Sequence, residues 1–128
     1  MSKQLPNELL YTKQHEWLEV NGNHATLGIT DHAQELLGDI VFVELPEVNS
    51  THNASDSLGV IESTKAASDF YAPITGTITK VNHELVSNPE IINQDPYQQG
   101  WLCKIQINNS SEPDQLLTAE QYQDLIKD

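Results

Sequence analysis

Short apolar segments of strand character, each ended within a few residues by glycine, proline or asparagine, dominate the middle of this chain. Residues 16–20 and 24–29 flank Asn21-Gly22-Asn23, and Asn-Gly accommodates the positive φ angles that tight hairpin turns require. Repeated short strands divided by such turns predict a small antiparallel sandwich or barrel with helical appendages. Alternation along the second arm of this hairpin places three apolar side chains on one face, which we expect to be core: Ala25, Leu27 and Ile29.

Two segments carry the signals of a helix start. Asp31 stands three residues before Gln34, at the spacing of a capping box, and Gly38 follows soon after. We therefore expect a short helix with Asp31 as its N-cap and Gly38 at its end. Thr118 and Gln121 repeat the capping-box spacing and predict a terminal helix packed on the strands. Four apolar residues recur there near helical spacing: Leu117, Tyr122, Leu125 and Ile126.

The central segments predict further strands. Residues 40–43 form a continuous apolar run, rich in β-branched residues, that predicts a buried strand. Polar turn formers at 46–57 predict a loop, and strand character resumes at 58–61. The small polar residues that follow, before Phe70-Tyr71-Ala72, predict a tight hairpin with its tip near Lys65. The last expected strands lie at 77–81 and 101–107.

Composition limits the classes of protein to consider. The chain has 128 residues, 38% of them hydrophobic, so we expect one domain, residues 1–128, whose core needs no disulfide or structural metal. There are 19 acidic and 6 basic side chains, and the net charge of −13 disfavours nucleic acid and anionic membranes as partners.

The single cysteine, Cys103, lies in an apolar run and is expected to be a buried thiol. Without a membrane-spanning stretch or a signal pattern in residues 1–10, we expect a cytoplasmic protein, and we expect a monomer.

Familiar catalytic motifs do not occur. The chain has no Gly-rich phosphate loop, no Gly-x-Ser-x-Gly elbow, no His-Glu-x-x-His and no paired cysteines. Its five histidines lack the spacing of metal ligands. We therefore expect neither catalytic residues nor a metal site.

Lys65 has an unusual setting. It is the only basic residue between Lys13 and Lys80, and it lies at the expected tip of a hairpin. Its neighbours at 63, 64 and 66–68 are all small, so its amine would project where a modifying enzyme could reach it. This setting favours an attachment site, although a lysine on an exposed turn is more often a solubilising charge.

The segment GVIESTKAASD at 59–69 resembles the lipoyl-lysine segment of the glycine cleavage system H-protein family. The resemblance extends in order over about residues 11–126, and an ordered series of matches is more specific than one short motif. Two positions differ from the family pattern: Thr64 replaces a usual valine, and Asn49 replaces a common turn glycine, for which asparagine is the next-best residue. The other matching segments are HEW at 15–17, GITDHAQ at 28–34, LGDIVFVELP at 37–46, NPE at 88–90, DPY at 95–97 and GWL at 100–102.

The resemblance implies a mainly β fold, the barrel-sandwich hybrid of lipoyl domains, with lipoic acid joined to Lys65 by an amide bond. It implies a non-catalytic carrier that accepts a methylamine group from the pyridoxal-phosphate-dependent glycine decarboxylase. The folate-dependent aminomethyltransferase then takes this group, and dihydrolipoamide dehydrogenase reoxidises the dithiol. A lipoylating enzyme is implied as a further partner. The cofactor and these partner enzymes would carry out the bond-making and bond-breaking steps.

The resemblance also assigns roles to three carboxylates. Glu16 matches the family glutamate that meets the methylamine nitrogen, and a carboxylate suits an ammonium group. Glu62 matches a position implicated in recognition by lipoylating enzymes, and Asp69 matches an acidic position near the base of the arm. Glu62 and Asp69 could equally be ordinary solvated side chains. Three aromatic residues are expected in the core rather than in a cleft: Trp17, Phe42 and Trp101.

Four other functions share some of these features. An H-like relay that donates lipoyl groups to other enzymes would not need Glu16, because it holds no methylamine. A biotin carrier has methionines on both sides of its lysine, whereas the only methionine here is Met1. A lipoyl domain of a 2-oxoacid dehydrogenase would be shorter and would lack the segments at 15–17 and 100–102. The last alternative is an unmodified, structural acidic β domain.

Overall fold

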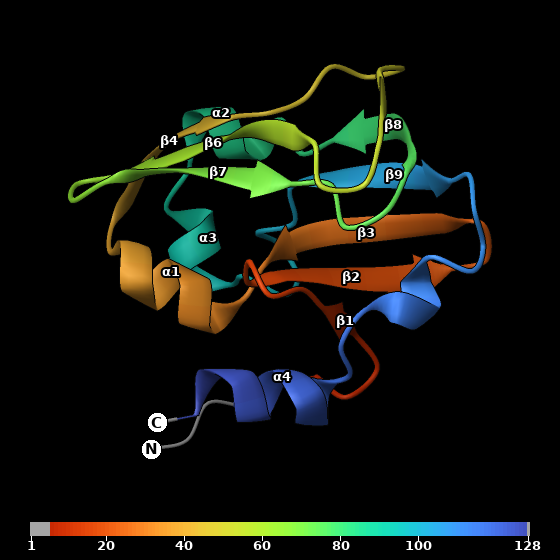
Figure 1. The fold of residues 1–128 in the computed structure, drawn as a ribbon. Helices are drawn as coiled ribbons and strands as arrows, with labels where there is room; N and C mark the ends of the chain where they lie inside the picture. The colour runs from red at the N-terminus through yellow and green to blue at the C-terminus, as the bar shows by residue number, and fades with distance from the viewer. Residues whose placement is uncertain (1–5, 128) are drawn as a thin grey trace.

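The computed structural model describes residues 6–127 and contains two antiparallel sheets with short helices around them (Figure 1). The larger sheet has the strand order β1-β2-β3-β9-β8-β5, and the smaller has the order β4-β6-β7. This arrangement confirms the prediction of a mainly β fold with a C-terminal helix. The strands are β1 (Leu10–Tyr11), β2 (Glu16–Asn21), β3 (His24–Ile29), β4 (Ile40–Glu44), β5 (Thr51–His52), β6 (Ser57–Ser63), β7 (Ala67–Tyr71), β8 (Gly76–Val81) and β9 (Cys103–Ile107). The helices are α1 (Asp31–Leu37), α2 (Glu84–Ser87), α3 (Ile91–Gln94), a 3-10 turn η1 (Pro113–Gln115) and α4 (Ala119–Ile126).

The main core lies between the apolar faces of the two sheets. Ile105 of the larger sheet and Ile61 and Phe70 of the smaller sheet are almost fully buried in one cluster. Cys103 belongs to the same cluster, and burial raises the pKa of its thiol to about 12, as expected for an inert core cysteine. The predicted inward face of β3 is confirmed, since Ala25, Leu27 and Ile29 are all buried.

Strand β4 corrects two predictions. Ile40 and Val43 are buried, but Val41 and Phe42 are 55% and 48% exposed, so neither the fully buried strand nor the core position of Phe42 was right. The reason is that β4 is an edge strand, paired only with β6, and its register shifts between Ile40 and Phe42. The other two aromatic residues fit better: Trp17 is 1% exposed, and Trp101 is half-buried.

Helix α1 begins one residue earlier than predicted. Thr30, not Asp31, is its N-cap, because the Thr30 hydroxyl accepts the Ala33 N–H at 3.1 Å. Asp31 occupies the first turn instead, where a negative charge favours the helix dipole. The predicted end is right: Gly38 has φ of 84° and ψ of −157°, a conformation that is essentially restricted to glycine.

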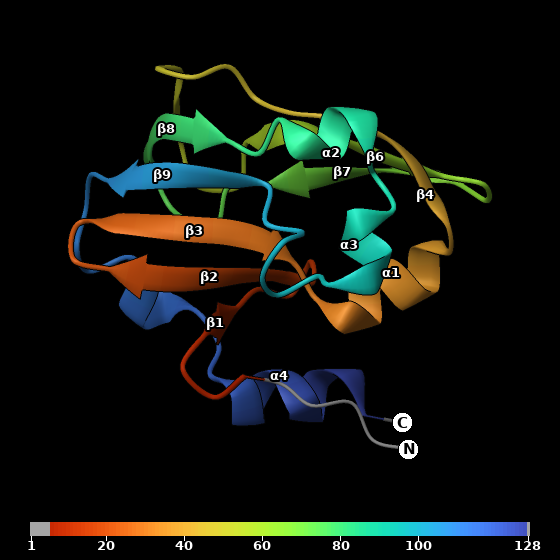
Figure 2. The ribbon, with the colours of Figure 1, turned by 180° about the vertical axis from the view of Figure 1, so that it is seen from behind.

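The C-terminal helix α4 lies next to β1, at the edge of the larger sheet (Figures 1 and 2). The predicted capping box is present, with the Thr118 hydroxyl and the Gln121 side chain each accepting the other residue's backbone N–H. A second apolar cluster forms where the helix meets the sheet. Its buried members are Leu9, Tyr11, Trp17, Ala119 and Tyr122.

Some local structure lies in segments where turn-forming residues predicted none. The short strand β5 falls within the expected loop at 46–57, and α2 and α3 are single turns around the prolines that follow β8. Asn49 has φ of 74°, which fits its substitution for a turn glycine. These pieces connect the sheets.

Candidate functional site

Lys65 lies at the tip of the β6–β7 hairpin, which projects beyond the rest of the fold in both views (Figures 1 and 2). Its side chain is exposed, as predicted. Ser63 builds the turn: its Oγ accepts the backbone N–H of Lys65 and of Ala66, each at 3.1 Å, and donates to the Ala66 carbonyl oxygen. The Ser63 N–H donates to the same carbonyl at 2.7 Å. One serine therefore fixes the backbone that presents the lysine.

The tip of the hairpin is attached to the end of α1. The Thr64 N–H donates to the Asp39 carbonyl oxygen at 3.0 Å. The stem of Lys65 passes over Gly38, where an added Cβ would lie 3.0 Å from Lys65 Cε. Gly38 thus serves the turn after α1 and also leaves room for the lysine methylenes.

A narrow cavity of about 140 Å³, here called the α1 cleft, runs between α1 and the hairpin. Its apolar wall includes Leu36 and Leu37 of α1 and Phe70 of β7. Asp69 and Glu16 contribute the acidic groups. The lining includes buried Glu16 and also Leu37, which directly precedes Gly38, the glycine beside the Lys65 stem.

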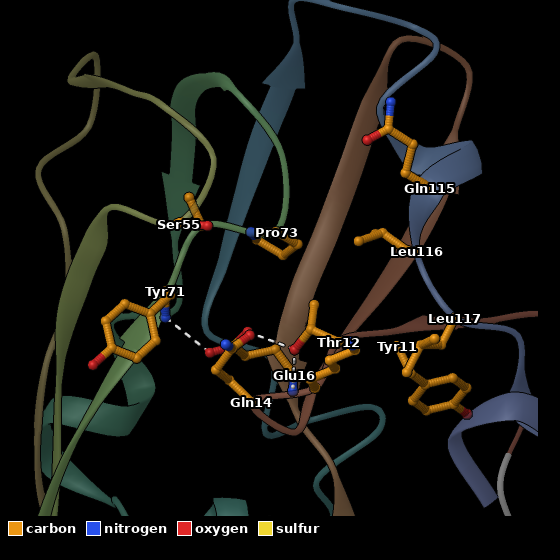
Figure 3. Close-up of a pocket in the computed structure, with 12 residues that line it drawn as sticks. Tyr11, Thr12, Gln14, Glu16, Ser55, Tyr71, Pro73, Gln115, Leu116 and Leu117 are labelled. Carbon is orange, nitrogen blue, oxygen red and sulfur yellow. Dashed lines mark hydrogen bonds between the residues drawn. The ribbon is translucent and has the colours of Figure 1, made fainter. Parts of the chain in front are cut away.

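Glu16 is only 1% exposed, although it is charged. One carboxylate oxygen accepts the Thr12 hydroxyl at 2.7 Å, and the other accepts the Tyr71 N–H at 2.9 Å, as the dashed lines in Figure 3 show. Burial raises the pKa of Glu16, and the two hydrogen bonds oppose that rise. Each oxygen keeps a free lone pair, so the carboxylate is oriented and can accept a hydrogen bond from a cation.

A second cavity, of about 320 Å³, shares Glu16 and Gln14 with the α1 cleft. Figure 3 shows Glu16 at its floor, between Tyr71 and Thr12. Pro73 and Leu116 contribute apolar surface to this cavity. Glu16 therefore borders two cavities, although almost none of its surface is exposed to solvent.

The other predicted carboxylates differ in position. Asp69 is exposed, accepts the Ser57 hydroxyl at 3.0 Å and lines the α1 cleft. Glu62 is exposed on β6 opposite Ala67 and is not among the residues that line the cleft. The structure thus brings Asp69 and Glu16 together around one cavity and leaves Glu62 outside it.

Sequence reasoning missed several residues of this site. Thr12 orients Glu16, and Leu36 and Leu37 form a wall of the α1 cleft. The leucines were visible only as apolar helix residues, and nothing in the spacing of Thr12 and Glu16 indicates a contact. Within residues 6–127, no group of three or more His, Cys, Asp or Glu side chains could hold a metal ion. No helix in that range is long and apolar enough to cross a membrane.

Comparison with known proteins decides the family. A family model described as glycine cleavage H-protein matches residues 9–128. The chain belongs to this family. Proteins named glycine cleavage system H protein from Carboxydothermus hydrogenoformans and Herpetosiphon aurantiacus are each 49% identical over 124 residues, covering 97% of this chain and 95% of the relative. A crystal structure of a glycine cleavage system H protein from Mycobacterium marinum superposes with a TM-score of 0.85 at 41% identity, covering 94% of this chain and 97% of that one.

Membership confirms the resemblance found in the sequence and gives the fold its name, the lipoyl-domain barrel-sandwich hybrid. As an H protein, the chain is the lipoyl-carrying shuttle of the glycine cleavage system. It therefore works with the other components of that system.

Proposed function

We propose that this H protein carries lipoic acid in amide linkage on Lys65 and that Glu16 holds the methylamine nitrogen in the α1 cleft. The observation that carries the proposal is the cleft itself, which is lined by the buried, oriented carboxylate of Glu16 and by Leu37, the residue before the glycine beside the Lys65 stem. An unmodified structural domain would have no use for open space beside a buried carboxylate, whose desolvation the two hydrogen bonds offset only in part. A lipoyl relay without methylamine would likewise have no use for it.

The residues fit a lipoyl arm. Gly38 leaves space beside the Lys65 methylenes that a Cβ would fill. Beyond it, the leucine and phenylalanine side chains of the α1 cleft offer apolar contact to an aliphatic chain. The backbone of Lys65 is positioned by the hydrogen bonds of the turn, which acylation of the side-chain amine would leave intact.

The protein's own residues orient the lipoyl arm, attract the methylamine nitrogen and shield the bound group from water. When bound, the lipoyl group supplies a dithiolane whose sulfur can accept and release the methylamine group. The rigid hairpin fixes the base of the arm, while the charge of Glu16 attracts the ammonium nitrogen. The apolar wall of the α1 cleft limits access of water to the bound group.

The proposal extends to partners and to the absence of catalysis by this chain. The partners are the pyridoxal-phosphate-dependent glycine decarboxylase, the folate-dependent aminomethyltransferase, dihydrolipoamide dehydrogenase and a lipoylating enzyme. We propose that all bond making and breaking takes place in those enzymes and that this chain is a monomeric, non-catalytic carrier. Exposed Glu62 and Asp69, close in sequence to Lys65, give the lipoylating enzyme acidic groups to recognise.

Intact mass of the protein, incubated with lipoate, ATP and a lipoate ligase, tests the attachment. One added lipoyl group is expected, and peptide mapping should place it on the peptide that contains Lys65. Subsequent incubation with the glycine decarboxylase and glycine should add one methylamine group. Lipoylation without loading would contradict the proposed holding of a methylamine group by this protein, and lipoylation on another lysine would contradict the attachment site.

Ser63 gives a separate prediction about presentation of the lysine. Ser63→Ala removes the hydroxyl that holds the turn, so lipoylation should slow and the free energy of unfolding should fall by about 1 kcal/mol. Ser111→Ala is the matched control, because it removes another exposed turn hydroxyl, the one that donates to Asn109. Equal lipoylation rates in the two variants would show that the Ser63 turn is not part of the recognition.

A further inference from the structure

The hydroxyl of Tyr122 joins two walls of the α1 cleft from a third element. Tyr122 lies on α4 and is fully buried. Its oxygen is 2.7 Å from His15 Nδ1 and 2.8 Å from Thr30 Oγ1. His15 adjoins Glu16 and lines the cleft, and Thr30 caps the helix that supplies the opposite residues.

Two directions of donation fit this chain of contacts, and the one in which Thr30 donates also uses the hydrogen of the buried Thr30 hydroxyl. Thr30 Oγ1 already accepts the Ala33 N–H, so its own hydrogen is available for the Tyr122 oxygen. The Tyr122 hydrogen then goes to His15 Nδ1, which leaves the imidazole proton on Nε2. Burial and the neighbouring His32 lower the pKa of His15, which favours the neutral ring that this arrangement needs.

His15 needs such support because its backbone is strained. Its φ of 73° lies in the left-handed region, which a residue with a Cβ adopts at a cost. The His15 carbonyl also accepts the Thr30 N–H at 3.0 Å, so the backbone bond and the Tyr122 hydroxyl together join these two residues. Removing the hydroxyl would leave the backbone bond and the contact between the His15 and His32 rings, but no side-chain hydrogen bond, between His15 and the start of α1.

We propose that Tyr122 is a positioning residue. Its hydroxyl holds the start of β2, where Glu16 lies, and α1 at the spacing that keeps the methylamine group in place. The inference rests on the proposed function of Glu16 and adds to it that α4, which does not line the cleft, sets the lifetime of the loaded carrier. The loaded carrier here means the lipoylated protein that bears the methylamine group.

Tyr11 provides a matched control. Its ring stacks on Tyr122 with centroids 4.9 Å apart and planes 10° apart, and it is equally buried. Its hydroxyl, however, donates to the Pro6 carbonyl oxygen at 2.7 Å, and Figure 3 shows the ring turned away from Glu16. Tyr11→Phe and Tyr122→Phe therefore each remove one hydroxyl from the same pair of rings, but only the second removes the link to the cleft.

The experiment compares both variants with wild type as full-length, lipoylated proteins. It measures the melting temperature, the extent of loading by the glycine decarboxylase, the rate at which the loaded carrier loses methylamine and the ¹⁵N chemical shifts of the His15 ring. Both variants should lose similar stability and load like wild type. Tyr122→Phe should lose methylamine about fivefold faster than Tyr11→Phe, and only it should shift the His15 Nδ1 resonance.

Equal loss rates in the two variants would overturn the positioning role. The wild-type spectrum is a second test that needs no variant: an unprotonated Nδ1 supports the donor chain, and a protonated Nδ1 contradicts it. A failure of the proposed role of Glu16 is distinguishable, because Glu16→Gln would then lose methylamine at the wild-type rate.

Discussion

Lys65→Arg should yield a folded H protein that accepts no lipoyl group and supports no glycine cleavage. The guanidinium stays protonated in proteins, so it offers no nucleophilic amine for acylation. The fold should be unaffected, because the side chain is exposed and its main contact is with Gly38. Intact mass after ligase treatment and glycine-dependent turnover of the reconstituted system should both be at background.

Lys80→Arg is the control for this prediction. Lys80 is also exposed, but it lies on β8, away from the hairpin tip. It should be lipoylated and active like wild type. An added lipoyl mass on the Lys65→Arg protein would assign the attachment to another lysine and would remove the basis of the proposed function.

The lysine could be predicted from the sequence because everything that presents it is local. Ser63 and Ala66 close the turn within four residues, and small neighbours leave the side chain exposed. The hairpin of β2 and β3 was predictable for the same reason, since Gly22 and its neighbours determine the turn. Features of this kind depend on the residues next to them in the chain.

The surroundings of Glu16 could not be predicted, because they depend on contacts between distant residues. Tyr71 donates to its carboxylate from 55 residues away, and the leucine wall of the cleft comes from α1. The resemblance to H proteins identified Glu16 but gave no reason for its burial. The prediction that Phe42 lies in the core was wrong for a similar reason. A run of apolar residues does not reveal that a strand lies at a sheet edge.

The cap of α1 shows how a local rule can select the wrong neighbour. Asp31 and Gln34 have capping-box spacing, and their side chains do interact, with Gln34 donating to Asp31 at 2.7 Å. Thr30 nevertheless takes the N-cap, because its hydroxyl also meets Tyr122 of the C-terminal helix. A tertiary contact therefore accompanies the shift of the cap by one residue.

Glu16→Gln should leave folding and lipoylation intact but shorten the lifetime of the loaded carrier by about tenfold or more. The amide keeps the shape of the side chain and one acceptor oxygen, but it has no charge for the ammonium group. A hydrogen bond to a charged group contributes about 1.5–3 kcal/mol, and 1.4 kcal/mol corresponds to a factor of ten. The measurement is the rate at which methylamine is lost from the loaded, purified protein.

The pH dependence of the same rate separates charge from shape. Only ionised Glu16 attracts the ammonium group, and burial raises the pKa of this carboxyl, so wild-type protection should weaken as the pH falls toward that raised value. The Gln variant has no proton to gain and should lack this change, so the two rates should converge at low pH. Glu19→Gln, an exposed change on the same strand, should behave like wild type at every pH. Parallel profiles for wild type and Glu16→Gln would mean that the carboxylate charge does not hold the methylamine.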